Sequence, residues 1–141
     1  MNVYTKSAWL SHSCSMGTFL CILAATFLAC AVARADLYIS EFLAENTGGL
    51  TDSDGEFSDW IELFNSGPQS INLGGYFLTD DEAALSKWTF PATELEPGQF
   101  LLAFASGKDR RVAGEELHTN FKIDKEGEYL ALVAPDGITV I

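Results

Sequence analysis

Short apolar runs alternate with turn-forming residues from Leu37 onward, and this alternation limits the fold more than any other feature of the sequence. No segment has the sustained 3.6-residue periodicity of an amphipathic helix. Pro97 and Gly98 suit the central positions of a type II turn, which need a fixed negative φ and then a positive φ. Several short strands separated by turns predict an all-β domain, a β-sandwich. The predicted strands are residues 37–43, 60–64, 76–79, 87–90, 100–105, 121–123, 129–133 and 138–141, and the predicted turns are 65–68, 96–99 and 135–137.

An N-terminal leader precedes this domain. Residues 16–32 are apolar and uncharged, and Ala33-Arg34-Ala35 has the small-x-small pattern that signal peptidase cuts. The sequence therefore predicts a signal-peptide helix at residues 1–35, cleavage after Ala35, and a secreted or cell-surface protein. Two alternatives are an uncleaved membrane anchor and lipid attachment at Cys30, which ends a weak lipobox-like stretch.

Removal of the leader changes the composition of the chain. All three cysteines lie within it, so residues 36–141 form neither disulfides nor thiolate metal sites. Lys6 and Arg34 also leave, so six basic residues face all 20 acidic ones, for a net charge of 6 − 20 = −14. This charge disfavours binding to nucleic acids and to anionic membranes. It suits solubility, a bound cation or a basic partner. A chain of this length forms one domain.

Several segments of residues 36–141 resemble the lamin-tail domain family of bacterial exported proteins, in the expected order. The longest runs from Asp52 to Asn65, and the others are residues 39–46, 71–81, 87–91, 95–99 and 127–132. The resemblance implies an immunoglobulin-like β-sandwich that docks other molecules, with no catalytic residues. Similar domains continue past the last hairpin, so the chain is expected to be part of a longer protein.

The acidic loop, residues 52–59, is the best candidate for a metal site. Asp52, Asp54 and Asp59 surround a glycine turn, and Glu62 follows on the next strand. Calcium takes six to eight oxygen ligands, which such carboxylates supply. The spacing differs from that of an EF-hand. The sequence predicts a calcium site here, with a solvated acidic turn as the alternative.

Glu62 lies between aromatic residues on its own strand, because side chains two residues apart share a strand face. Trp60 and Phe64 are those neighbours, so the carboxylate is expected to be partly buried. A partly buried carboxylate needs a partner. Lys87, a backbone donor or an ion are the candidates.

Other candidate residues are expected to be structural. The aromatic rings of Trp60, Trp88, Tyr76 and Phe77 are predicted to be core rather than a sugar-binding platform. His118, the sole histidine after the leader, is expected to be an ordinary edge or loop residue. The basic cluster at residues 108–111 is too small for a nucleic-acid patch.

The sequence contains none of the familiar catalytic motifs, so the chain is predicted not to be an enzyme. We expect a non-catalytic extracellular adhesion or binding module, part of a larger surface or secreted protein, whose partner is a protein or a cell-surface polysaccharide. Two alternatives stay open. The chain is the accessory domain of an extracellular enzyme, or it is a calcium-stabilised carbohydrate-binding module with an exposed Trp60 or Trp88.

Overall fold

The computed structural model describes residues 37–141. The predicted leader, its cleavage after Ala35 and lipid attachment at Cys30 lie outside the described residues. Within them the regular structure is entirely β, and no helix is long and apolar enough to cross a membrane. The strands are β1 Leu37–Leu43, β2 Asp59–Asn65, β3 Ile71–Asn72, β4 Phe77–Thr79, β5 Trp88–Thr89, β6 Glu94–Leu95, β7 Phe100–Ala105, β8 Leu117–His118 and β9 Ala131–Val133.

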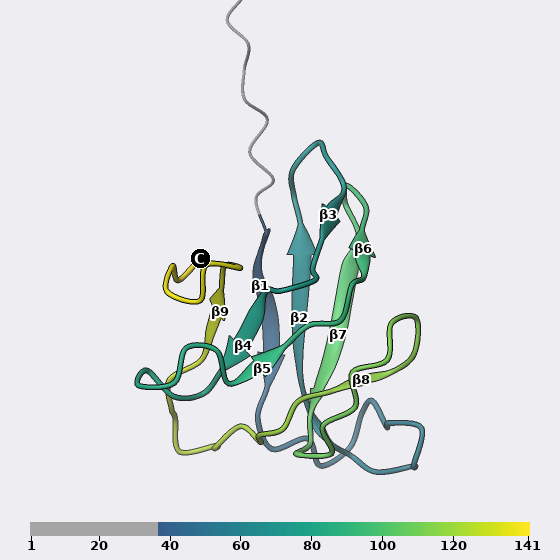
Figure 1. Cartoon of the computed structure of the whole chain (residues 1–141). Helices are drawn as coiled ribbons and strands as arrows, with labels where there is room; N and C mark the ends of the chain where they lie inside the picture. Colours follow the sequence, from purple (N-terminus) through teal and green to yellow (C-terminus); the bar gives the residue numbers. More distant parts are fainter. Residues whose placement is uncertain (1–36) are drawn as a thin grey trace, which may run out of the picture. The chain divides into compact units, whose positions relative to one another are not determined.

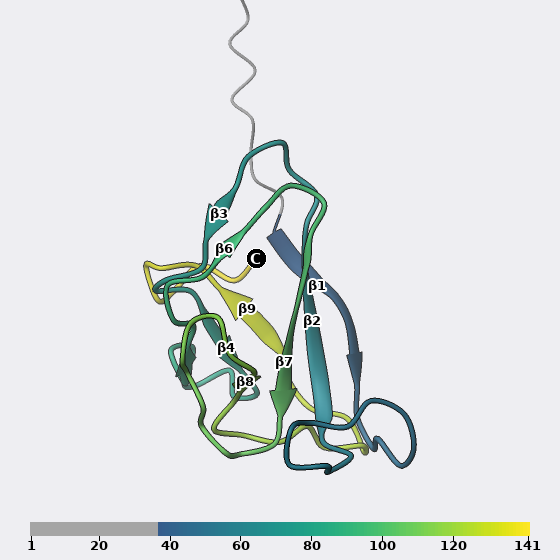
Figure 2. The same cartoon turned by 90° about the vertical axis from the view of Figure 1, so that its right-hand side faces the viewer.

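These strands form two facing layers (Figures 1 and 2). One layer is a four-stranded sheet in the order β1-β2-β7-β8, antiparallel except for the parallel pair β7–β8. The other is the antiparallel sheet β5-β4-β9, and a small β3–β6 pair lies at one end. The predicted immunoglobulin-like β-sandwich is therefore confirmed.

Strand β2 shows how the sequence pattern produces the layers. Ile61, Leu63 and Asn65 point inward and are buried, while the alternate side chains point outward and are half-buried. Ile61 pairs with Ala103 of β7, and Leu63 pairs with Leu101. Because a strand has a two-residue period, this register places all the inward residues against the opposite sheet.

The opposite sheet completes the core with large apolar side chains. Leu78 of β4 lies between Trp88 of β5 and Leu132 of β9, and all three are fully buried. The Trp88 ring meets Phe90 edge-on, with 4.8 Å between the ring centroids. These contacts bury the apolar area that drives the two layers together.

The predicted turn at residues 96–99 is present. Gly98 has a φ of 74°, and the Gln99 N–H donates to the Glu96 carbonyl at 3.0 Å. The side-chain amide of Asn65, fully buried beside this turn, donates to the Leu95 and Gln69 carbonyls at 2.8 Å each. The end of β2 is thereby fixed to the β3–β6 pair.

The sequence reading was wrong about several short elements. Residues 121–123 and 138–141 make only the single bridges Ser106–Lys122 and Val133–Val140. Hydrogen bonds from Ile138 and Thr139 to the Asp136 carboxylate hold the latter segment in a turn instead. Strands β3, β6 and β8 were missed because two residues are too few to show a period.

Leu63→Ala tests the core that these strands share. We expect it to lower the free energy of unfolding by about 2–5 kcal/mol, because a buried leucine is replaced by a cavity. Ile138→Ala, at a side chain that is 75% exposed, serves as the control and should change it by less than about 0.5 kcal/mol. Urea unfolding measures both. Similar losses in the two variants would contradict this description of the core.

Candidate binding site

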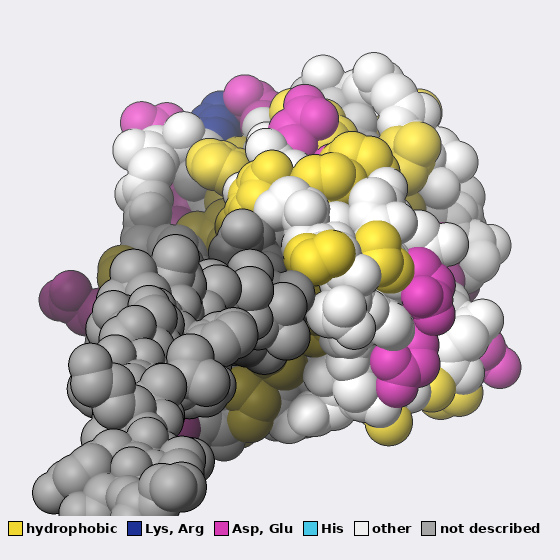
Figure 3. Space-filling view, turned by 90° about the horizontal axis from the view of Figure 1, so that it is seen from above, with side chains coloured by type: hydrophobic (Ala, Val, Ile, Leu, Met, Phe, Trp, Pro, Cys, Tyr) yellow, Lys and Arg dark blue, Asp and Glu magenta, His cyan; other side chains and the backbone are white. Residues whose placement is uncertain are grey.

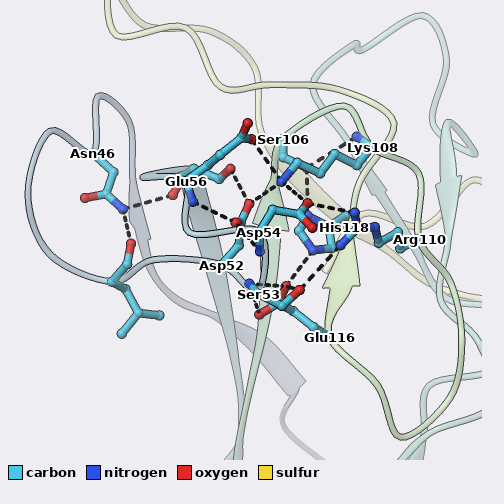
Figure 4. A network of polar contacts seen from close by, with 12 residues as sticks. Asn46, Asp52, Ser53, Asp54, Glu56, Ser106, Lys108, Arg110, Glu116 and His118 are labelled. Carbon is cyan, nitrogen blue, oxygen red and sulfur yellow. Dashed lines mark hydrogen bonds and ion pairs between the residues drawn. The ribbon is translucent and has the colours of Figure 1, made fainter.

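The acidic loop is organised around the buried carboxylate of Asp52 (Figure 4). This carboxylate accepts hydrogen bonds from the backbone N–H groups of Asp54 and Glu56, both at 3.0 Å, and from Ser58 Oγ at 2.8 Å. Lys108 Nζ donates the fourth, at 2.5 Å. The loop is therefore ordered by its own backbone and by one ammonium group from the segment that follows β7.

Lys108 is the cation at the centre of the loop. Its Nζ lies 2.6 Å from Asp54 Oδ2 and 3.0 Å from Glu56 Oε2, in addition to Asp52. Arg110 adds a second contact to Asp54, at 2.7 Å. Figure 4 shows Asp52, Asp54 and Glu56 on one side of these contacts and the two basic side chains on the other. The basic cluster at residues 108–111 thus neutralises the acidic loop.

These contacts shift the protonation of both partners. Burial raises the pKa of Asp52, but hydrogen bonds from Lys108, Glu56 and Ser58 outweigh it and hold the pKa well below its usual range. Burial lowers the pKa of Lys108, but hydrogen bonds to Asp52, Asp54 and Glu56 more than reverse this and raise it above its usual range. Both groups stay charged at neutral pH.

The structure brings together only two of the four residues predicted to bind calcium. Asp52 and Asp54 meet at Lys108, whereas Asp59 accepts a hydrogen bond from the Asn46 N–H at 2.9 Å. Glu62 lies on β2, where its partner is Ser40. Residues 37–141 contain no cluster of three or more His, Cys, Asp or Glu side chains that is placed to hold a metal ion. Calcium binding stays a prediction.

A second polar group adjoins the loop. His118 Nδ1 lies 2.8 Å from Ser106 Oγ, and His118 Nε2 lies 2.8 Å from Glu116 Oε1. Glu116 also accepts hydrogen bonds from the N–H and hydroxyl of Ser53. His118 lies in the edge strand β8, as expected, but it is fully buried and stacks on Phe104.

Ser106, His118 and Glu116 form a hydrogen-bonded chain in the same order as the catalytic groups of serine hydrolases. The two backbone N–H groups that follow Ser106, however, do not form an oxyanion site. The Gly107 N–H donates to the Phe121 carbonyl at 3.1 Å, and the Lys108 N–H points to Ser106 Oγ itself at 3.3 Å. Acyl transfer needs free donors at such positions. The group therefore holds β8 and the acidic loop together. No local sequence signal indicated this role for Ser106 and Glu116.

The outward-facing side of the four-stranded sheet carries rows of apolar side chains, here called the outer sheet face. In the first row, Tyr38 packs edge-on against Phe64, which stacks on Phe100 with 4.4 Å between the ring centroids. Tyr38 is 42% exposed and Phe100 is 57% exposed. The face is made up of Tyr38, Leu43, Trp60, Glu62, Phe64, Phe100 and Leu102, with Glu41 beside Glu62.

Glu62 is the half-buried carboxylate of this face. The sequence predicted Lys87, a backbone donor or an ion as its partner. The donor is instead the Ser40 hydroxyl, 2.6 Å from Glu62 Oε1. A bulge in β1 between Ile39 and Glu41 leaves Ser40 without an opposite residue on β2. Lys87 pairs with Asp80 at 2.5 Å.

The predicted core aromatics are divided between the interior and its margin. Trp88 is fully buried, and Trp60, Tyr76 and Phe77 are half-buried. The exposed rings are others, notably Phe100 and Tyr38. Figure 3, which looks onto the β3–β6 end, shows hydrophobic side chains gathered on the surface with acidic side chains beside them.

A hollow of about 630 Å³ lies beside the end of the acidic loop, because Asp59 is one of its lining residues. Glu45, Lys122, Asp124, Lys125 and Glu128 are among its lining residues. Lys125 and Glu45 pair across it at 2.9 Å, and both are exposed. This mixture of opposite charges indicates a solvated hollow.

The fold agrees with a match among known families. A family model described as the Lamin Tail Domain covers residues 31–141. The chain belongs to the lamin tail domain family. No curated protein matches this lamin tail domain, and no solved structure does. Membership fits a non-catalytic immunoglobulin-like module and leaves the partner to be argued from its surface.

Lys108→Met tests the contribution of the central cation of this lamin tail domain. Asp52 keeps three donors, so we expect the free energy of unfolding to fall by about 2–3 kcal/mol. Because folding lowers the pKa of Asp52, the stabilisation is present above about pH 4 and is lost as the pH falls further. Urea unfolding between pH 7 and pH 2, run as a series on the order of five pH values, should therefore show a shallower acid loss in Lys108→Met.

Lys125→Met is the matched control for that experiment. Its pair with Glu45 is exposed, so its removal should cost no more than about 1 kcal/mol. Equal losses from the two lysines would show that Lys108 has no special role.

Lys108→Gln tests calcium binding, because it leaves Asp52 and Asp54 without their ammonium partner. We expect a larger calcium-dependent rise of the unfolding midpoint in this variant than in the natural chain. A site with a dissociation constant a hundredfold below the free calcium adds about 2.7 kcal/mol of stability. Identical midpoints with calcium and with chelator in both chains would remove the calcium hypothesis.

Proposed function

We propose that this lamin tail domain is a non-catalytic binding module of an exported protein and that it engages a protein partner through the outer sheet face. The row Tyr38–Phe64–Phe100 is the observation that carries the proposal. Aromatic side chains held in a sheet offer a large contact area at little entropic cost, and they are enriched among the residues that dominate protein interfaces.

The exposure of these rings supports a role in binding rather than in folding. Phe100 and Tyr38 project from the two strands that flank β2, in one row of a sheet whose other side already forms the core. Folding does not require an aromatic side chain at such outward positions. Contiguous apolar surface on a folded domain marks an interaction site.

Charge narrows the chemistry of the partner. Glu62 and Glu41 lie in the row next to the aromatic rings, and the chain carries a formal net charge of −12. A lysine or arginine side chain of a partner that contacts this row meets both a carboxylate and an aromatic ring. We therefore favour a protein with an apolar and basic patch. Nucleic acids and anionic lipids repel such a face, and membrane attachment would depend on the uncleaved leader.

The export of the protein, to the cell surface or the medium, rests on the leader at residues 1–35. An accessory role beside an extracellular catalytic domain is the second candidate, and it uses the same outer sheet face. The gene beyond the codon for Ile141 distinguishes the two: a catalytic domain there favours the accessory role.

Photo-crosslinking from the face tests the proposal. We expect a benzoylphenylalanine in place of Phe100, in the chain expressed by its own cells, to crosslink one specific protein. The same replacement of Phe57 is the matched control, because Phe57 is 50% exposed but lies on the acidic loop. Phe64→Ser should weaken binding of the crosslinked protein by about 2 kcal/mol, or roughly thirtyfold, as for interface hot spots.

Two results would contradict the proposal. Equal crosslinks from Phe100 and Phe57 would show that the outer sheet face has no preference. Enrichment of a polysaccharide instead of a protein would favour the carbohydrate-binding alternative.

A further inference from the structure

Ser106 carries a hydroxyl group that is paired with a buried base. Its Oγ lies 2.8 Å from His118 Nδ1, and His118 Nε2 lies 2.8 Å from Glu116 Oε1 (Figure 4). A base beside a hydroxyl, oriented by a third group, is the arrangement that turns a weak nucleophile into a reactive one. The chain of hydrogen bonds that joins β8 to the acidic loop therefore also bears on the chemistry of Ser106.

The charge of Glu116 fixes where the protons lie in this chain. Burial raises the pKa of Glu116, but hydrogen bonds from Ser53 and His118 outweigh it and lower that pKa below its usual value. An ionised carboxylate only accepts hydrogen bonds, so the neutral imidazole of His118 carries its proton on Nε2. Nδ1 is then a bare acceptor, and the Ser106 hydroxyl donates to it.

The base is held in place on every side. The imidazole of His118 is fully buried and stacks on Phe104, with 5.4 Å between the ring centroids. Glu116 accepts hydrogen bonds from the N–H and the hydroxyl of Ser53, at 2.9 Å and 2.8 Å. The imidazole therefore needs no reorientation before it takes a proton from Ser106.

Ser106 is accessible from the surface. It is half-buried and lines a hollow of about 180 Å³, to which Phe57 of the acidic loop adds an apolar side chain. This hollow adjoins the hollow of about 630 Å³, because Asp59 and Lys122 line both. A small molecule therefore has a route to the Ser106 hydroxyl.

Lys122 is the basic residue of the smaller hollow. It lies opposite Ser106 in an antiparallel bridge, so the two side chains project to the same side. Lys122 Cε lies 3.8 Å from the position that a Cβ on Gly107 would occupy. Within residues 37–141 its ammonium group has neither a hydrogen bond nor an ion pair. Because the backbone N–H groups after Ser106 are engaged, negative charge that develops there depends on Lys122 for stabilisation.

We infer that Ser106 is a nucleophile that captures an acyl group from a small neutral activated ester, with His118 as its base and Lys122 beside the developing negative charge. Glu56 and Asp59 line the same hollow and disfavour an anionic ester. The inference is independent of the outer sheet face and stands if that face binds nothing.

The capture transfers one acyl group. Ser106 Oγ forms a bond to the carbonyl carbon of the ester while its proton moves to His118 Nδ1. The bond from that carbon to the leaving oxygen breaks, and the proton passes from His118 to the departing alcohol. Water could release the acyl group only by expelling the Ser106 alkoxide, a poorer leaving group than that of an activated ester. The reaction therefore stops at the acylated serine, and the module stays without turnover.

Acetylation of the full chain by p-nitrophenyl acetate tests the inference. We expect peptide mapping by mass spectrometry to find an acetyl group on Ser106. Hydroxylamine should remove it, because hydroxylamine cleaves esters and leaves the amides formed at lysine side chains. Ser70 is the internal control, since its hydroxyl donates to the Glu94 carboxylate at 2.9 Å without a histidine beside it. It should stay unmodified.

Substitutions test the assigned roles. His118→Gln removes the base and should slow acetylation of Ser106 by about a hundredfold. Lys122→Met should slow it by about a hundredfold as well, as for the loss of an oxyanion donor. Lys125→Met, at a lysine that lines only the larger hollow, is the matched control and should leave the rate unchanged. Urea unfolding shows whether each variant is folded, and Lys122→Met is expected to be, because its ammonium group has no partner.

Four outcomes would overturn the inference. Ser106 stays unmodified, or Ser106 and Ser70 are acetylated at the same rate, or Lys122→Met is acetylated at Ser106 as fast as Lys125→Met. The fourth is continued release of nitrophenolate beyond one equivalent that Ser106→Ala abolishes, which would show turnover instead of a single capture.

The result is separable from the proposed binding function. Phe64→Ser, which should weaken binding at the outer sheet face, should leave acetylation of Ser106 unchanged. Loss of partner binding with normal acetylation, or the reverse, would therefore decide the two proposals separately.

Discussion

The contact between Asp52 and Lys108 is the interaction on which the acidic-loop end of this lamin tail domain depends. The Asp52 carboxylate is buried away from water, and the Lys108 ammonium reaches it from the segment that follows β7. A desolvated carboxylate is tolerable only with such a partner. The same ammonium neutralises Asp54 and Glu56, so a loop rich in acids closes onto the sheet instead of being repelled by its own charge.

The two sides of the four-stranded sheet differ in role. Its inward side chains pack with those of β4 and make the core. Its outward side carries the row Tyr38–Phe64–Phe100, which is the surface that we propose for a protein partner. The acidity of the chain favours a basic partner at this surface.

The features that follow from local rules were predictable from the sequence. The two-residue period of a strand predicted that Trp60 and Phe64 share a face with Glu62. Proline and glycine at positions 97 and 98 predicted their turn. Contacts between distant segments were not predictable: Lys108 meets Asp52 across 56 positions in the chain. The acidic loop was predicted to be a calcium site because clustered carboxylates can bind either a metal ion or an ammonium group. The burial of His118 was not predictable, because the two residues of β8 are too few to show a pattern.

The separation of Asp52 and Lys108 along the chain also has a kinetic consequence. Closing so large a loop is slow, and the parallel pairing of β7 with β8 adds another non-local step. Asp52 gains nothing by leaving water before Lys108 arrives, so we expect the ion pair to form after the folding barrier has been crossed. Interactions that form late govern the rate of unfolding rather than the rate of folding. We therefore expect this contact to set how long a folded molecule resists proteolysis.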